Sequence, residues 1–106
     1  MSLSLKYWYD ILTFMLNYEL VLLFDPVLGE AEDKALKAKI KKWLVGAKIE
    51  KEENWGRKKL AYLINKKVEA TYHYYLFASD VDLLKNLEPK LKLEEKIMRY
   101  LIIKQS

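Results

Sequence analysis

The apolar residues of this chain repeat with two different periods, and the order of these periods limits the folds that the chain can adopt. Residues 18–25, YELVLLFD, alternate with the period of a β-strand. One face of this strand carries Tyr18, Leu20, Leu22 and Phe24. Val21 and Leu23 make the opposite face largely apolar too, which is typical of a central strand that is covered on both sides. Asp25 and Pro26 end the strand, because proline lacks a hydrogen-bond donor and restricts the residue before it.

From about Glu30 to Val45 the period changes to that of an amphipathic helix. Its apolar stripe consists of Leu36, Ile40, Trp43, Leu44 and Ala47. Acidic residues in the first turn and lysines near the end complement the helix dipole. These charged residues are Glu30, Glu32, Asp33, Lys41 and Lys42. Gly46 supplies the stop.

Two further strands follow the helix. Residues 47–65 predict a long strand that is bent or bulged near Gly56. Residues 71–79, TYHYYLFAS, predict an aromatic strand, and the turn before it is expected at Glu69 and Ala70.

The last part of the chain predicts a second helix and a final strand. Asp80 is expected to cap the helix at its N-terminus. Its apolar stripe consists of Val81, Leu84, Leu87 and Leu91. Pro89 is expected to end or kink this helix, because it removes a backbone hydrogen bond. Residues 97–104, IMRYLIIK, predict the final strand.

The predicted order is therefore βαββαβ. Two strand–helix–strand units with right-handed crossovers give an α+β, ferredoxin-like sandwich, in which a four-stranded antiparallel sheet carries both helices on one face. The second face of the sheet has no helix over it. We expect this face to carry apolar residues from the first and last strands and to be covered by something else.

Composition narrows the class of protein further. With 106 residues, the chain is long enough for one domain, and its 52% hydrophobic and 32% charged residues are typical of a globular protein. The net charge of +4 fits a polyanionic partner without requiring one. Of the 19 cations only Arg57 and Arg99 are arginine, so the chain is better suited to contacting phosphates than to reading base edges. There is no cysteine, and no apolar run is long enough to span a membrane.

No residue pattern indicates catalysis, a metal or a cofactor. His73 is the single histidine, and we interpret it as an exposed or satisfied strand residue rather than a general base. The carboxylates of 30–33 and 50–53 are explained by a helix terminus and a solvated strand. The acylphosphatase branch of the ferredoxin-like fold uses a glycine-rich phosphate loop, which is absent. We therefore predict that the chain is not an enzyme and has no small-molecule substrate.

The stretch NWGRKKLAYLINKK, residues 54–67, concentrates positive charge without an acid from Arg57 to Val68. Alternation would place Arg57 and Lys59 on one side of the strand and Lys58 on the other. One interpretation is an edge strand whose lysines block aggregation. The other is a nucleic-acid surface, because aromatic residues that can stack on bases surround the cations. Those aromatic residues are Trp55, Tyr62, Tyr72, Tyr74 and Tyr75.

The same stretch, NWGRKKLAYLINK, resembles the W-G-R-[RK]-x-L-A-Y-P-I-N-K signature of the family of bacterial small-subunit ribosomal protein six. The resemblance extends over about residues 15–104: Tyr18-Glu19 opens the first strand, and residues 97–101, IMRYL, resemble the closing V-[LI]-R-x-L strand. Leu63 stands where the signature has proline, and Lys92 where an arginine is common.

The resemblance implies a cytoplasmic, non-enzymatic constituent of the small ribosomal subunit. It implies that the chain binds the central domain of 16S rRNA as a heterodimer with ribosomal protein eighteen, and that the partner docks on the uncovered sheet face. The residues expected to contact RNA or the partner are Arg57, Lys58, Lys59, Tyr62, Lys66, Lys67, Lys92 and Arg99. Residues 1–14 are expected to be an N-terminal extension and 15–106 a single domain. The alternative is a non-ribosomal ferredoxin-like regulatory or dimerisation module that uses the same open face.

Overall fold

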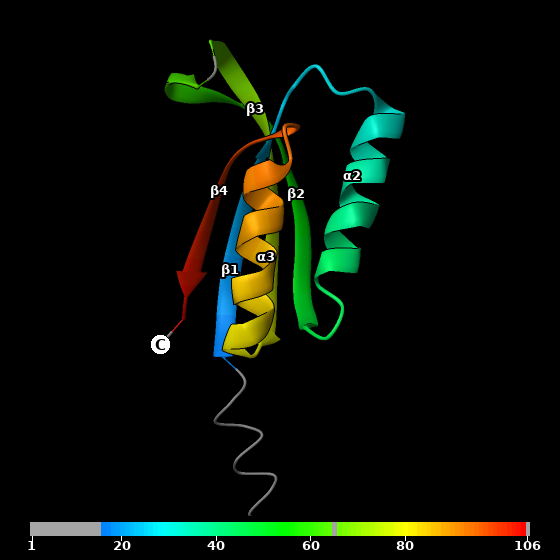
Figure 1. Cartoon of the computed structure of the whole chain (residues 1–106). Coiled ribbons are helices and arrows are strands. Elements are labelled where there is room, and N and C mark those ends of the chain that lie inside the picture. Colours follow the sequence, from blue (N-terminus) through cyan, green and yellow to red (C-terminus); the bar gives the residue numbers. More distant parts are fainter. Residues whose placement is uncertain (1–15, 65, 106) are drawn as a thin grey trace, which may run out of the picture.

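The computed structural model describes residues 16–64 and 66–105, and its elements follow the predicted order (Figure 1). The elements are β1 (Leu16–Phe24), α2 (Glu30–Trp43), β2 (Lys48–Ile64), β3 (Lys67–Ser79), α3 (Val81–Leu93) and β4 (Ile97–Lys104). The predicted extension, residues 1–14, lies outside the described residues.

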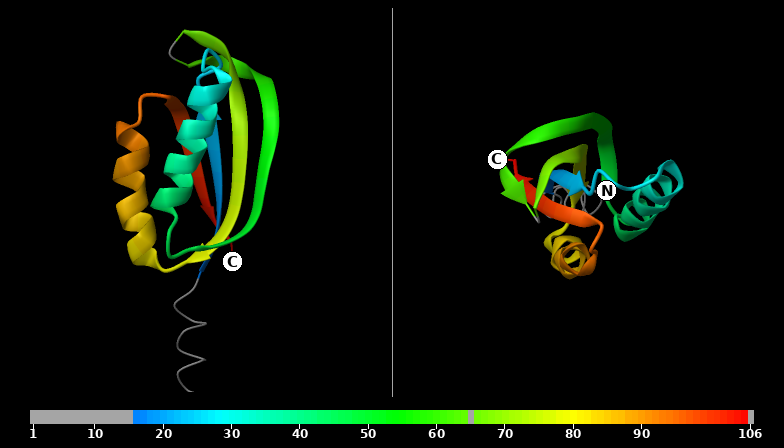
Figure 2. Two further views of the ribbon diagram at one scale, coloured as in Figure 1. Left: turned by 90° about the vertical axis from the view of Figure 1, so that its right-hand side faces the viewer. Right: turned by 90° about the horizontal axis from the view of Figure 1, so that it is seen from above.

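The four strands form one antiparallel sheet in the order β2-β3-β1-β4. Both helices lie on the same side of it, so the described part of the chain has two layers (Figure 2). The ferredoxin-like fold predicted from the sequence is therefore confirmed. Because β1 lies between β3 and β4, it is a central strand, as its two apolar faces indicated.

The core lies between the sheet and the helices. The side chains of β1 that were predicted to share a face, Tyr18, Leu20, Leu22 and Phe24, are all buried there. Tyr75 and Phe77 from β3 join them. The helices contribute Leu36, Ile40, Leu87 and Leu91. Loss of one such leucine to alanine removes packing that typically contributes about 2–5 kcal/mol.

The predicted N-terminal cap of α3 is confirmed, but its predicted end is not. Asp80 caps α3 by accepting a hydrogen bond from the backbone N–H of Leu83 at 2.8 Å. Pro89, however, does not end α3, which continues to Leu93. The prediction that the helix ends at Pro89 was therefore wrong. Pro89 lies on the exposed side of the helix, where water can satisfy the carbonyl that it leaves unpaired.

The β2–β3 hairpin departs most from a flat sheet. Its register shifts three times, between Ile49 and Lys51, between Asn54 and Gly56, and between Lys59 and Ile64. The bend predicted near Gly56 is confirmed, and Gly56 has a φ of +78°, a conformation that glycine adopts without strain.

The turn predicted at Glu69 and Ala70 is wrong, because these residues belong to β3 and pair with Lys59 and Lys58. The chain instead reverses beside Lys66, which has a φ of 64°.

None of the helices in the described ranges 16–64 and 66–105 is long and apolar enough to cross a lipid bilayer.

Candidate functional site

The sheet face opposite the helices carries three rows of side chains that run across the strands. The strand register places Tyr72, Leu23 and Arg99 in the row nearest the hairpin. The next row contains Tyr74, Val21 and Leu101, and the last contains Leu76, Glu19 and Ile103. The apolar residues expected from the first and last strands are thus present. Leu101 and Ile103 are 53% and 43% exposed.

An aromatic cluster occupies the β2 side of this open face. The ring of Trp55 stacks on Tyr74, with 4.8 Å between ring centroids and an interplanar angle of 14°. The Lys58 ammonium lies 5.6 Å from the centroid of the Trp55 ring and 5.9 Å from that of Tyr72. Lys58 is therefore held against two aromatic faces while its charge remains exposed.

The hairpin arches over the open face and encloses a hollow of about 370 Å³ against β1 and β4. In the view from above, the end of the hairpin bends round the side of the sheet that lies away from the helices (Figure 2). The residues that line the hollow are Leu23, Leu60, Ala61, Tyr62, Ile64, Tyr72, Arg99, Tyr100 and Leu101. Tyr62 and Arg99, which lie far apart in the sequence, are thereby brought together.

Two of the predicted cations make hydrogen bonds or ion pairs within the domain. The Arg57 guanidinium donates a 2.7 Å hydrogen bond from Nη2 to the carbonyl oxygen of Pro26, and its Nε lies 3.7 Å from Glu69. The Nζ of Lys67 lies 3.8 Å from Oδ1 of Asp25. These two side chains tie the hairpin to the loop after β1, so they have a structural role in addition to any contact with a ligand.

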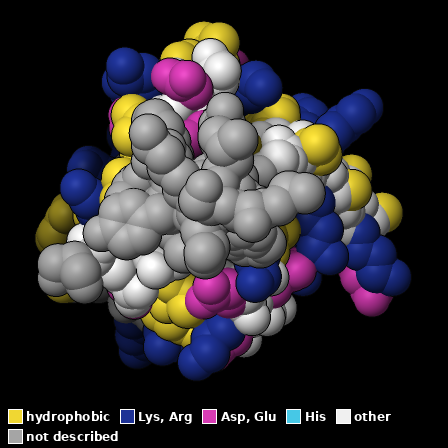
Figure 3. Space-filling view, turned by 90° about the horizontal axis from the view of Figure 1, so that it is seen from below, with side chains coloured by type: hydrophobic (Ala, Val, Ile, Leu, Met, Phe, Trp, Pro, Cys, Tyr) yellow, Lys and Arg dark blue, Asp and Glu magenta, His cyan; other side chains and the backbone are white. Residues whose placement is uncertain are grey.

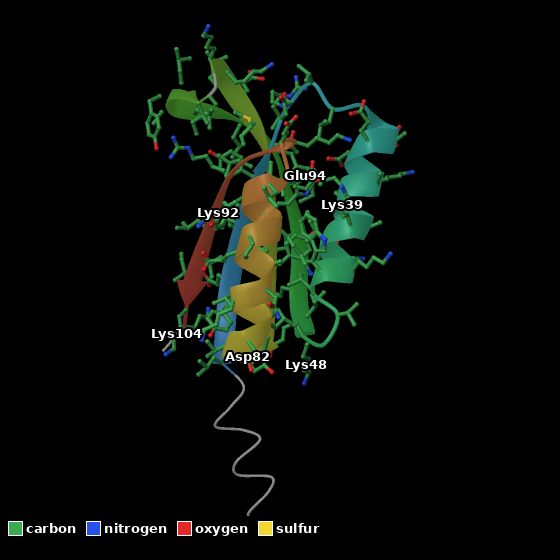
Figure 4. All side chains as sticks on the ribbon, in the orientation of Figure 1. Lys39, Lys48, Asp82, Lys92, Glu94 and Lys104 are labelled. Carbon is green, nitrogen blue, oxygen red and sulfur yellow. The ribbon has the colours of Figure 1, made fainter. Side chains whose placement is uncertain are left out.

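The other predicted cations, Lys58, Lys59, Lys66, Lys92 and Arg99, form no ion pair within the described part of the chain and are exposed. The register places Lys58 on the open face and Arg57 and Lys59 on the other, as predicted. Lys92 lies apart from the hairpin, in the last turn of α3, with its side chain directed outward (Figure 4).

Comparison with known proteins identifies the family. Residues 17–104 match the family model of ribosomal protein S6. The chain belongs to the bacterial ribosomal protein S6 family. Members of this family are structural constituents of the small ribosomal subunit and not enzymes, so this S6 family member is a small-subunit constituent.

Individual relatives agree with this assignment. The chain is 39% identical to small ribosomal subunit protein bS6 of Geobacter metallireducens over 83% of its own length and 76% of the relative's. It is 38% identical to bS6 of Christiangramia forsetii, covering 85% and 82% of the two chains. The crystal structure of S6 from Thermotoga maritima superimposes with a TM-score of 0.81 at 30% identity, covering 86% of this chain and 88% of that one.

The hollow of this S6 family member was not predicted from the sequence. Its apolar walls, Leu23, Leu60 and Leu101, come from three strands, and they meet only because the hairpin bends. The sequence carried one indirect signal: Leu23 and Leu101 were expected on a face that no helix covers.

His73 is buried at 2% exposure and faces the core, so the interpretation as an exposed or satisfied residue was wrong. Its ring packs on Phe24 with 4.1 Å between centroids, and its Nε2 makes no hydrogen bond, lying 3.6 Å from Asp33. Burial lowers the pKa of His73 below its ordinary value, although the Asp33 carboxylate opposes the shift. No group of three or more metal-ligating side chains occurs among residues 16–64 and 66–105.

The opposite end of the molecule offers no comparable charge. A depression there lies between the end of α2 and the start of α3, and it is lined by Asp80 and Asp82 as well as by Lys42 and Lys90. Seen from below, acidic and basic side chains are mixed at this end (Figure 3). The hairpin differs in that no acidic residue interrupts the sequence from Arg57 to Val68.

Proposed function

We propose that this chain binds the central domain of 16S rRNA together with ribosomal protein eighteen, the hairpin contacting RNA and the open sheet face contacting the protein. The observation that carries the proposal is the separation of two surfaces. Lys58, Lys59 and Lys66 of the hairpin have no carboxylate partner among the described residues, and the exposed apolar side chains Leu101 and Ile103 lie on β4 beside half-buried Val21 of β1.

The hairpin surface consists of Lys58, Lys59, Tyr62 and Lys66. Its lysine ammonium groups are exposed and are free to exchange water for phosphate oxygens. Tyr62 is 66% exposed, which makes its ring available for stacking. Arg57 and Lys67 support this surface by fixing the hairpin to Pro26 and Asp25.

The apolar surface consists of Val21, Leu101 and Ile103. Exposed leucine and isoleucine on an edge strand, beside a valine of the neighbouring strand, are typical of a protein-binding face when no helix covers them. Since β4 is an edge strand, a partner can also reach its backbone hydrogen-bonding groups. Arg99, which lines the hollow beneath the hairpin and precedes Leu101 on β4, lies between the two surfaces, so they are adjacent but distinct.

The test is an electrophoretic titration of this chain against a 16S central-domain fragment, with and without ribosomal protein eighteen, at several salt concentrations. Each phosphate contact releases counterions, so we expect affinity to fall with salt and to rise when the partner is present. Equal affinity for an unrelated RNA of the same length, unaffected by the partner, would refute the proposal.

Paired variants separate the two surfaces. Ile103→Asp is expected to reduce the effect of the partner and to leave binding of the RNA alone unchanged, because Ile103 lies on the open face but does not line the hollow. The matched control is Val45→Asp, because Val45 is 75% exposed in the loop after α2, away from the open face. If both variants weaken the partner's effect equally, the open face is not the docking surface.

A further inference from the structure

We infer that the hollow beneath the hairpin receives one unstacked base of the bound RNA. The inference rests on the proposed RNA binding and adds to it the part of the RNA that this chain recognises. A chain that contacts only phosphates cannot distinguish a duplex from a loop, whereas a chain that holds an extruded base requires an unpaired nucleotide.

The shape of the hollow suits a planar heterocycle. Its volume of about 370 Å³ lies at the lower end of the range of roughly 300–1,000 Å³ found for small-ligand pockets. Leu23 and Leu101 from the sheet form apolar walls on one side, and Leu60 and Ile64 from the hairpin form them on the other. The hollow is open to solvent, so that the polar edge of a base and its attached sugar can remain hydrated.

The aromatic and cationic residues of the hollow can stack on a base and contact its phosphate. Tyr62 and Tyr72 offer ring faces, and the Arg99 guanidinium is planar and can stack or contact a phosphate. Tyr72 also lies against Lys58, which carries positive charge to the edge of the hollow. No aspartate or glutamate lines it.

An apolar hollow could accept either a side chain of a partner protein or a base of RNA. The positive charge at its rim favours the base. An apolar side chain of a partner protein would fill the same space, but it needs no cation at the rim. Arg99 forms no ion pair within residues 16–64 and 66–105, and Lys58 of the arching hairpin lies on the same face of the sheet. An anionic chain that carries planar groups matches both features.

The experiment is a double-mutant cycle between Tyr62 and individual nucleotides. The 16S central-domain fragment is prepared with a single abasic site at each unpaired position in turn, and its affinity is measured for the parent chain and for Tyr62→Ala. We expect Tyr62→Ala to weaken binding by roughly 5- to 150-fold, as the loss of one stacked base does. One abasic position should cause a similar loss in the parent and no further loss in Tyr62→Ala.

Two further variants control for the fold and for the ring. Leu63→Ala removes an equally exposed neighbour that does not line the hollow, and we expect its affinity within about twofold of the parent's. Tyr62→Phe keeps the ring and should bind as the parent does. Circular dichroism melting curves of all variants should coincide, because the side chain of Tyr62 is mostly exposed.

The outcomes distinguish a failure of this inference from a failure of the proposed RNA binding. If the parent binds the fragment but no abasic position couples to Tyr62, the hollow holds no base, and the proposed RNA binding stands. If Tyr62→Ala weakens binding of ribosomal protein eighteen in the absence of RNA, the hollow holds a protein side chain and the inference is wrong. If the parent does not bind the fragment at all, both fail.

Discussion

The cations of the hairpin should separate into a structural group and a ligand-binding group. Arg57 donates a hydrogen bond to Pro26 and lies near Glu69, whereas Lys58, Lys59 and Lys66 make no ion pair in the described part of the chain. The two variants to compare are Arg57→Ala and the triple replacement of the three lysines by alanine. We expect the first to lower stability and the second to lower RNA affinity.

The magnitudes follow from the contacts. A hydrogen bond from a charged donor contributes about 1.5–3 kcal/mol, and an exposed ion pair adds at most about 1 kcal/mol. Because the Arg57 side chain is 59% exposed, solvent screening reduces both contributions, and we expect a total loss of about 1–2 kcal/mol. For a domain of this size such a loss lowers Tm by about 4–16 °C. The triple variant loses the two exposed cation–π contacts of Lys58, each of which contributes about 0.5–1 kcal/mol.

The assays are thermal melting and RNA titration across salt concentrations. If the three lysines each contact a phosphate, their loss should reduce the log–log salt slope by about 2–3. Arg57→Ala should change that log–log salt slope by no more than about 1, the value for a single phosphate contact. A triple variant that melts early with an unchanged slope, or an Arg57→Ala variant that keeps its Tm and loses the slope, would refute the assignment.

Three other variants test the fold. Because burial lowers the pKa of His73, the unfolded chain binds more protons as pH falls below about 6.5; stability measured by urea titration should fall there, and His73→Leu should flatten that fall. The hydrogen bond from Lys39 lowers the pKa of Glu94, so its stabilisation is present above pH 4.5 and is lost as pH falls through the folded pKa; Glu94→Gln should cost about 0.5–1 kcal/mol at pH 7 and nothing in acid. Gly56→Ala should lower the free energy of unfolding by about 1 kcal/mol through backbone strain alone, since a Cβ there meets nothing within 4 Å.

The fold could be predicted because the apolar residues of each strand and helix repeat with a period that a short stretch of sequence reveals. The apolar alternation of β1 and the stripe of α2 follow from neighbouring residues, and their order leaves few topologies. The two local errors have a common cause. Glu and Ala are depleted in strands and proline favours a helix end, yet pairing with β2 keeps Glu69 and Ala70 in β3, and α3 continues through Pro89.

The candidate site could be predicted only in part. Alternation correctly separated Arg57 from Lys58, but the acceptor that engages Arg57 is Pro26, 31 residues away, and no periodicity reveals such a contact. The burial of His73 was accessible from the sequence, because it shares its parity along β3 with Tyr75 and Phe77. The hollow was not accessible, since it depends on how far the hairpin bends.

The bulge at Trp55 explains how one strand carries both a structural cation and a ligand-binding surface. Asn54 pairs with His73 and Gly56 with Tyr72, so Trp55 is the extra residue between them. Strict alternation would have sent Trp55 to the helix face with Arg57. The bulge instead lets its ring stack on Tyr74, where it holds Lys58 on the open face.

The same bulge raises the local twist of β2, and twist is what carries the hairpin over β1 and β4. Gly56, with its φ of +78°, is the residue that permits this path. The Trp-Gly-Arg triplet of the family signature is therefore better understood as an architectural unit than as a set of ligand contacts. Its tryptophan presents a lysine, its glycine bends the strand, and its arginine fixes the hairpin to Pro26. On this reasoning, straightening the strand by deleting Trp55 should abolish the hollow and the proposed RNA-binding surface together.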